Sequence, residues 1–294
     1  MRRTLLAIAA FVTLALAPST ASAWGFEAHR FITRRAIDLL PSALKPFFEQ
    51  RREEIVLRVV DPDLWRNVGW PEDPHHFLDF GVKEYGVYPF AELPRDYGAA
   101  LEKFGRATLE RNGLLPWRTA EMFGDLRRTF EALRRQSPYT VSDTILYSAV
   151  MSHYVQDAYQ PFHATDDYDG VQTGQRGIHS RFERDLFERF QSRLAVNPPP
   201  PRPVTSARES SFDTLLTSYQ LVPAVLKADK DALVGRDAYD DQYFERFLAN
   251  VGPLLERRLG EAISATVGFI VGAWEQAGNP VLRLQDVRPL ERPR

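Results

Sequence analysis

Apolar residues at helical spacing are the feature that most restricts what this chain can fold into. Between residues 26 and 40, the apolar positions Phe31, Ile32, Ala36 and Ile37 follow a period of 3.6 and form one stripe. Similar patterns recur along most of the chain, whereas the alternation of period two that marks a half-buried strand is never sustained. The sequence therefore predicts an all-α fold, arranged as a single compact multi-helix domain.

The helical patterns cover the following ranges: 26–40, 41–59, 97–112, 116–135, 142–160, 178–194, 211–228, 238–258 and 259–276. The range 142–160 is apolar on most sides, so we expect it to be the central helix, with Ser142 as its N-cap. Prolines and glycines are frequent at about 61–97, which predicts a long irregular loop there. The aromatic residues within that loop argue against disorder. The proline-rich segment 197–204 indicates a surface loop.

The N-terminus has the layout of a secretory signal peptide. Arg2 and Arg3 precede an apolar run, and Ala21-Ser22-Ala23 forms an A-x-A cleavage site. The apolar run is about 13 residues long, too short for a membrane anchor across a hydrocarbon core of roughly 30 Å. We expect residues 1–23 to be removed, residues 24–294 to form the mature domain, and the protein to be exported to the periplasm or the extracellular medium.

Composition limits what can stabilise and bind such a protein. The sequence contains no cysteine, so an exported chain must rely on its core, on bound metals, or on both. The 37 basic and 39 acidic residues give a net charge of −2. Overall charge therefore excludes general attraction to polyanions, and a nucleic-acid enzyme would need a local basic patch.

The histidines fall in a pattern that suggests a metal site. His153 and Asp157 are four residues apart on the central helix, and His179 and Glu183 repeat this spacing, which places each pair on one helix face. His163 follows a proline that would end the central helix. One such pair on a solvated face would be only a local ion pair. A carboxylate on a mostly apolar helix, however, costs several kcal/mol unless it is paired or coordinated.

The same residues resemble those of a known superfamily. The segment 152–163 reads SHYVQDAYQPFH, with the pattern H-x3-D-x5-H, and His179 begins the pattern H-x3-E. Trp24 follows the expected cleavage site and precedes His29 by five residues. These motifs resemble the superfamily that unites bacterial zinc-dependent phospholipase C with the fungal and plant single-strand-specific nucleases. The resemblance covers at least residues 24–183 and implies an all-α fold that holds three zinc ions.

The resemblance also implies ligands for each zinc ion. The three sets are Asp63, His76, His153 and Asp157; the Trp24 amine and carbonyl with His29 and Asp157; and His163, His179 and Glu183. Asp157 would bridge the first two ions. Asp61 is an alternative to Asp63. We favour Asp63, because Asp63 and Arg66 together match the D-x-x-R pattern of the nucleases. His75 is left over as a neighbour of His76.

The implied chemistry is hydrolysis of a phosphoric ester. Two zinc ions can share a hydroxide that attacks phosphorus, and the third can neutralise the leaving oxygen. Asp63 could orient or deprotonate the attacking water, and Asp157 would hold the two ions together. Arg66 could pair with the phosphate, although a salt bridge within the loop is the simpler interpretation. We therefore expect a secreted zinc-dependent phosphodiesterase.

The substrate remains open between two classes. The spacing from Trp24 to His29 and the presence of Arg66 resemble the nucleases, in which Phe77 would stack a base and Asp79 would read its edge. The phospholipases have a similar H-F-x-D segment. Glu27 falls where the phospholipases have a glutamate that faces the choline head group.

Glu183, in place of the aspartate typical of the nucleases, also resembles the phospholipases. The expected partner is thus single-stranded nucleic acid or a phospholipid head group, the latter with transient membrane contact, and no stable protein partner is implied. The remaining alternative is an exported binding protein with structural zinc. The third ligand set has only three protein ligands, which leaves coordination positions open and favours catalysis.

Overall fold

The structure is a computed structural model that describes residues 24–135, 137–138 and 140–285. The expected signal peptide and the last nine residues lie outside this part of the chain. Among the described residues the fold is all-α, and the only β-type pairing is an isolated bridge between Phe80 and Thr165. The predicted fold class, a compact domain built from helices, is confirmed.

The helices have the following bounds: α1 Phe26–Asp38, α2 Lys45–Gln50, α3 Arg52–Arg58, α4 Asp61–Asn67, η1 Asp73–His76, η2 Lys83–Tyr85, α5 Tyr97–Phe104, α6 Arg106–Asn112, α7 Leu115–Arg134, α8 Thr140–Asp157, η3 Pro161–Ala164, α9 Ile178–Ser180, η4 Arg181–Asp185, α10 Leu186–Phe190, η5 Gln191–Arg193, α11 Ala207–Leu233 and α12 Asp241–Gln276. Most of them fall where the hydrophobic pattern predicts them.

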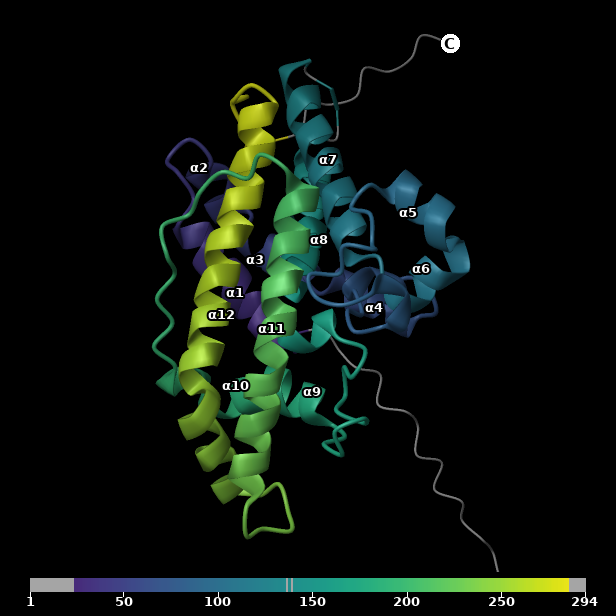
Figure 1. The fold of residues 1–294 in the computed structure, drawn as a ribbon. Helices are drawn as coiled ribbons and strands as arrows, with labels where there is room; N and C mark the ends of the chain where they lie inside the picture. Colours follow the sequence, from purple (N-terminus) through teal and green to yellow (C-terminus); the bar gives the residue numbers. More distant parts are fainter. Residues whose placement is uncertain (1–23, 136, 139, 286–294) are drawn as a thin grey trace, which may run out of the picture.

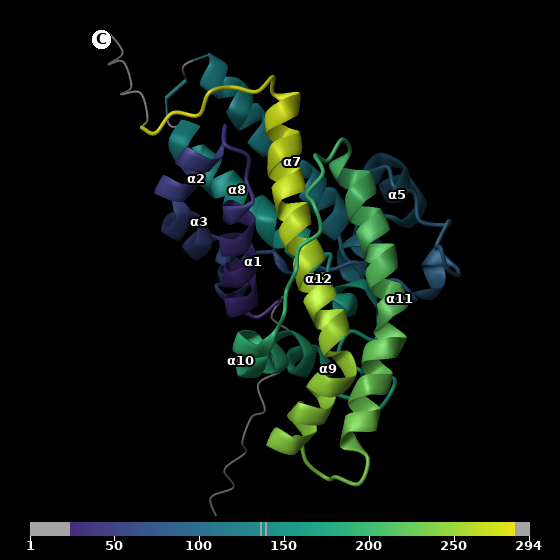
Figure 2. The same cartoon turned by 90° about the vertical axis from the view of Figure 1, so that its left-hand side faces the viewer.

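Four long helices, α7, α8, α11 and α12, form the body of the molecule (Figure 1). Helix α8 packs against both α7 and α12, and α3 covers another of its sides. Figure 2 shows α12 running between α1 and α11, and it contacts both. Most residues of α8 are buried, so the helix predicted to be central is the central one. Its C-terminal end lies inside the protein, where polar side chains need partners.

Some helix boundaries differ from those expected. The ranges 238–258 and 259–276 form one helix, α12, which continues through Pro253 because a continuous buried face that includes Leu255 and Leu259 packs on the core. The range 97–112 is instead divided at Gly105, whose φ of 75° lies in the left-handed region. Ser142 is not an N-cap, since α8 begins two residues earlier at Thr140.

The segment 61–97 is irregular over much of its length but contains α4, η1 and η2. Pro62 lies in the first turn of α4, where a missing N–H and a fixed φ are well tolerated, so a proline that suggested a loop instead begins a helix. Helix α4 ends in a Schellman motif. Gly69, with φ of 86°, donates to the carbonyl of Arg66, and Trp70 donates to the carbonyl of Trp65.

Within the described residues, no helix combines the length and the apolar character that crossing a bilayer requires.

Candidate metal centre

The C-terminal end of α8 is the meeting point of three groups of buried histidine and carboxylate side chains. The groups are His29, His153 and Asp157; Asp63, His76 and His153; and His163, His179 and Glu183. In each group the donor atoms all lie within 4.8 Å of one another. The side chains come from α1, α4, η1, α8, η3, α9 and η4, so segments far apart in sequence converge on one place.

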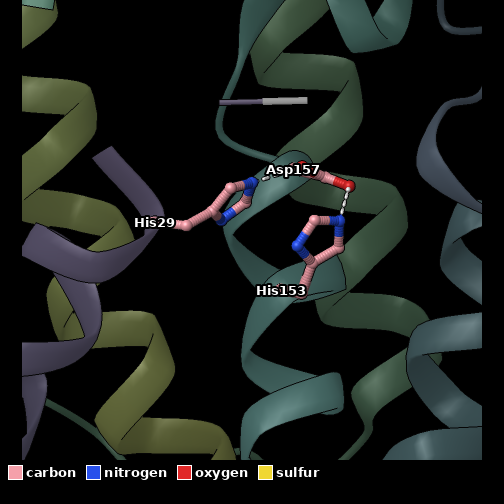
Figure 3. A group of neighbouring side chains, drawn as sticks. All are labelled: His29, His153 and Asp157. Carbon is pink, nitrogen blue, oxygen red and sulfur yellow. Dashed lines mark ion pairs between the residues drawn. The ribbon is translucent and has the colours of Figure 1, made fainter. Parts of the chain in front are cut away.

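Each of the two carboxylate oxygens of Asp157 lies near nitrogen atoms of two histidines. Its Oδ2 lies 3.1 Å from His76 Nδ1 and 3.2 Å from His153 Nε2. Its Oδ1 lies 3.4 Å from His29 Nε2 and 3.8 Å from His163 Nδ1. Figure 3 shows His29 from α1 and His153 from α8, each paired with this carboxylate, and their rings are stacked with centroids 4.2 Å apart. One side chain thus connects donors from separate groups.

Backbone carbonyls fix the tautomers of His153 and His163. His153 Nδ1 lies 2.9 Å from the carbonyl of Val59, and His163 Nδ1 lies 2.6 Å from the carbonyl of His76. A carbonyl only accepts, so each Nδ1 carries the proton and donates, and each Nε2 is left with a lone pair when the ring is neutral. His163 Nε2 faces His179 Nε2 at 3.1 Å. A cation between them would satisfy nitrogens that otherwise face each other.

Two glutamines support the candidate ligands from behind. His29 Nδ1 lies 2.7 Å from Gln156 Oε1, while Gln156 Nε2 donates to Thr33 Oγ1 at 3.0 Å. His29 Nε2 is therefore left facing Asp157. Gln160 Nε2 donates to Glu183 Oε2 at 2.9 Å. Outer hydrogen bonds of this kind orient metal-binding side chains and fix their tautomers.

Several donor atoms in this region are buried and lack a hydrogen-bond partner. They are His29 Nε2, both oxygens of Asp63, His76 Nε2, Asp157 Oδ1 and Glu183 Oε1. An unsatisfied buried polar atom costs about 1–3 kcal/mol, more when it is charged. So many in one place indicate a missing positive partner. These side chains fit a metal ion, and the groups could hold metal ions that prefer nitrogen and oxygen ligands.

Electrostatics keeps the buried carboxylates of Asp157 and Glu183 ionised. Burial alone would raise the pKa of Asp157, but His153 and His163 hold that pKa well below its usual range. Burial opposes ionisation of Glu183 as well, yet His179 and His163 lower its pKa to about 2. Burial lowers the pKa of His76. Burial also acts to lower the pKa of His153 and His163, but the carboxylate of Asp157 outweighs it and raises both. Metals bind ionised carboxylates and neutral imidazoles, so a metal ion would compete with protons at these two rings.

The helix that carries His179 and Glu183 is not the regular helix expected at 178–194. It divides into α9, a π-helical turn (η4), α10 and η5. His179 Nε2 lies 2.8 Å from Glu183 Oε2, so the pair is formed across the junction of α9 and η4. Wide turns of this type inside helices are rare and occur often at functional sites.

Asp63 lies in the cluster and Asp61 does not. Asp63 is fully buried, 3.9 Å from His76, and its Oδ1 is 3.3 Å from Arg66 Nη2. Asp61 is half-buried and pairs with Arg58 at 3.3 Å instead. Both sequence-based roles of Arg66 stay open, since it makes the local ion pair and also lies beside a candidate ligand.

Trp24 is anchored next to the cluster. Its side chain is fully buried, and its Nε1 donates to the carbonyl of Gln156, at 2.8 Å, one residue before Asp157. Its ring lies 6.1 Å from that of Phe182, the neighbour of Glu183. The residue expected to begin the mature chain is thus held between two of the donor groups.

The residues expected to bind substrate have different surroundings. Phe77 is half-buried, and its carbonyl approaches Gly113 so closely that a Cβ there would lie 2.1 Å from the oxygen. Asp79 is half-buried; burial and then Asp166 raise its pKa to about 8. Glu27 is exposed and pairs with Arg30 at 2.6 Å, outside the three groups.

Sequence reasoning missed a buried polar network behind His76. The hydroxyl of Tyr154 donates to Glu72, and the Tyr154 ring contacts the rings of His76 and His153, with centroids 5.8 and 5.5 Å away. His75 lies 3.3 Å from the same glutamate, so it belongs to this network and not to the donor groups. The sequence did offer one indication of this network. Tyr154 lies on a helix predicted to be buried, and the hydroxyl of a buried tyrosine must find a hydrogen-bond partner.

No protein-family model matches this chain, and no curated protein matches it.

Proposed function

We propose that this protein is a zinc-dependent phosphoric ester hydrolase that acts on phosphodiesters. The observation that carries the proposal is the position of Asp157, whose two oxygens face donors from separate groups while a further group lies beside them. Adjacent metal ions that share a carboxylate are a common arrangement for displacement at phosphorus. The motifs shared with the phospholipase C and single-strand nuclease superfamily support the same reaction class.

We assign three zinc ions to the donor cluster, because imidazole nitrogen and carboxylate oxygen are ligands that zinc prefers. His153 lies in two of the groups but has one free nitrogen, Nε2, which we assign to the ion of Asp63 and His76. Asp157 would contribute to two of the sites, and the amine and carbonyl of Trp24 would complete the one that contains His29. When bound, zinc supplies an acidified water at neutral pH and neutralises charge on phosphoryl oxygens. The signal-peptide pattern of residues 1–23 supports export of the enzyme.

The chain's own residues provide positioning around these ions. Arg66 lies beside Asp63, and its planar guanidinium suits two oxygens of a phosphate group. Both oxygens of Asp63 are buried without a hydrogen-bond partner, so this carboxylate could accept from a water molecule or take its proton. We assign Phe77 and Asp79 to contacts with the remainder of the substrate, since both follow His76 directly on the chain.

A non-catalytic protein with structural zinc is the alternative, and one observation favours it. The donor side chains are almost completely buried, with His163 and His179 exposed by only 3% and 4%. Structural zinc sites are closed in this way.

A hydrolysis assay separates these proposals. Protein that begins at Trp24 and is loaded with zinc would be incubated with single-stranded RNA or DNA and, separately, with phosphatidylcholine. We expect release of acid-soluble nucleotides or of phosphocholine. We expect Asp157→Asn to lower kcat by about 10²–10³, the loss that follows removal of one main electrostatic group. Asp229→Asn is the matched control, because Asp229 is also buried and ion-paired, to Arg181, outside the donor groups. Zinc binding without turnover of either substrate would favour the structural role.

A further inference from the structure

An exposed tryptophan stack follows directly after α4. The rings of Trp65 and Trp70 are stacked, with centroids 5.5 Å apart and planes inclined by 22°. Trp65 is half-buried, whereas Trp70 is 58% exposed. Tryptophan is highly buried on average, so a ring exposed to this extent is available to a partner.

The end of α4 explains how the stack is held. In its Schellman motif, Trp65 and Trp70 occupy the two positions that commonly make an apolar contact. This contact covers one face of Trp70 and fixes the ring in place. The opposite face is left for solvent, so the motif presents a flat and rigid aromatic surface that loses little conformational entropy on binding.

The stack adjoins the proposed site through Arg66. Arg66 follows Trp65 on α4, and its carbonyl accepts the hydrogen bond from Gly69, just before Trp70. The Arg66 side chain pairs with Asp63 in the donor cluster and with the exposed Asp73, and its Nε is buried without a partner. A phosphate held at Arg66 would therefore place a neighbouring group of the same molecule near Trp70.

We infer that the free face of Trp70 is a stacking subsite for a nucleobase of the substrate, next to the phosphate position at Arg66. The inference rests on the proposed function and specifies single-stranded nucleic acid as the substrate class. The Trp70 ring already stacks on Trp65, and its other face can stack on a further planar ring. Any nucleobase provides such a ring. The exposed neighbour Val68 has no flat face to offer a base, so it serves as the comparison.

Binding of a short phosphorothioate oligodeoxyadenylate, which is cut slowly, tests the subsite by quenching of tryptophan fluorescence. The zinc-loaded protein beginning at Trp24 would be compared with Trp70→Ala, Trp70→Phe and Val68→Ala. We expect Trp70→Ala to weaken binding about 5- to 150-fold, the range for loss of one stacked base. Trp70→Phe should restore most of the affinity, and Val68→Ala should bind like the parent protein. Because Trp70 is exposed, circular dichroism should show all three variants folded.

Three outcomes would overturn the inference: no oligonucleotide binding by the parent protein, unchanged binding by Trp70→Ala, or equal losses in Trp70→Ala and Val68→Ala. A parallel titration would use phosphatidylcholine vesicles. If Trp70→Ala and Val68→Ala both weakened vesicle binding and left oligonucleotide binding unchanged, the surface would be a lipid-binding surface instead. Turnover of a diester with unchanged binding by Trp70→Ala refutes the subsite alone. Oligonucleotide binding through Trp70 without turnover of any diester refutes the proposed reaction alone.

Discussion

Gln156 shows how a single polar residue on an apolar helix supports the candidate centre. Its side chain is fully buried, accepts from His29 and donates to Thr33, while its backbone carbonyl accepts from Trp24. An amide at this position orients the His29 ring so that Nε2 faces Asp157. A residue of similar volume without the amide oxygen would free the ring to rotate.

We therefore predict that Gln156→Met lowers zinc affinity. Loss of an outer hydrogen bond to a metal-binding histidine costs about 10- to 100-fold in affinity, and competition with a chromophoric chelator would measure it. Gln175→Met is the control, because Gln175 is also buried but bonds to Asp229 and the Leu226 carbonyl, away from the donor groups. Equal losses of zinc affinity in the two variants would contradict the orienting role.

Asp79 leads to a prediction about pH and stability. Burial raises its pKa to about 8, so in the folded protein the carboxyl keeps its proton where the unfolded chain, with a pKa near 4, has lost it. The stability that the neutral form contributes is complete below pH 4 and is lost as the pH rises toward 8.

Asp79→Asn should remove this pH dependence. We expect the variant to gain about 1–2 kcal/mol in free energy of unfolding relative to the parent protein at pH 8, and little at pH 4, since the side chain is half-buried and solvent screens part of the effect. Urea unfolding at both pH values, at the same metal content, measures the difference. A gain that is the same at both values would mean that ionisation of Asp79 is not its source.

At the scale of elements, helix periodicity predicted most of the fold because the helices bury continuous apolar faces. The central position of α8 followed from its composition. The convergence of His29, Asp63 and His76 on its C-terminal end was expected only from the resemblance to the superfamily. The four-residue spacing brought His179 and Glu183 together, and this pair was predictable because it depends only on local geometry.

Other features depend on contacts that no local pattern contains. In the π-helical turn that holds Glu183, Phe182 packs against Trp24 and Phe162, which are distant in sequence. The network of Glu72, Tyr154 and His75 also joins separate segments. The beginning of α4 at a proline was misjudged, because proline is unfavourable inside helices but favourable in their first turn.

The start of α1 gives a prediction at this scale. If the amine of Trp24 binds zinc, it must be free and unprotonated, and its ordinary pKa is about 7.7–8.0. A protein with one alanine left before Trp24 should therefore bind one zinc ion fewer than the protein that begins at Trp24, as counted by native mass spectrometry. The extended protein should remain folded, because the buried indole still donates to the Gln156 carbonyl. Equal zinc content in both proteins would exclude the amine as a ligand.

At the scale of the whole molecule, the donor groups connect elements that share few other restraints. The chain has no cysteine, and segments from α1, α4, η1, α8, η3, α9 and η4 meet at the cluster with unpaired buried charges and lone pairs. Metal bound there would act as a crosslink in place of disulfides. Without it, the carboxylates of Asp157 and Asp63 would remain buried beside histidines and Arg66 alone among the described ion pairs.

Removal of metal should therefore lower the thermal stability of the domain strongly and reversibly. Each site occupied at 100 times its Kd contributes about 2.7 kcal/mol to the folded state. For a domain of this size that corresponds to a rise in Tm of about 5–10 °C per site. Calorimetry of chelator-treated protein, before and after zinc is restored, measures the sum, and magnesium is the control because it prefers oxygen ligands. The same scans on Asp157→Asn should show a smaller response to zinc, since this carboxylate faces two groups. A Tm that zinc leaves unchanged would show that the cluster is stable as an ion-pair network and holds no metal.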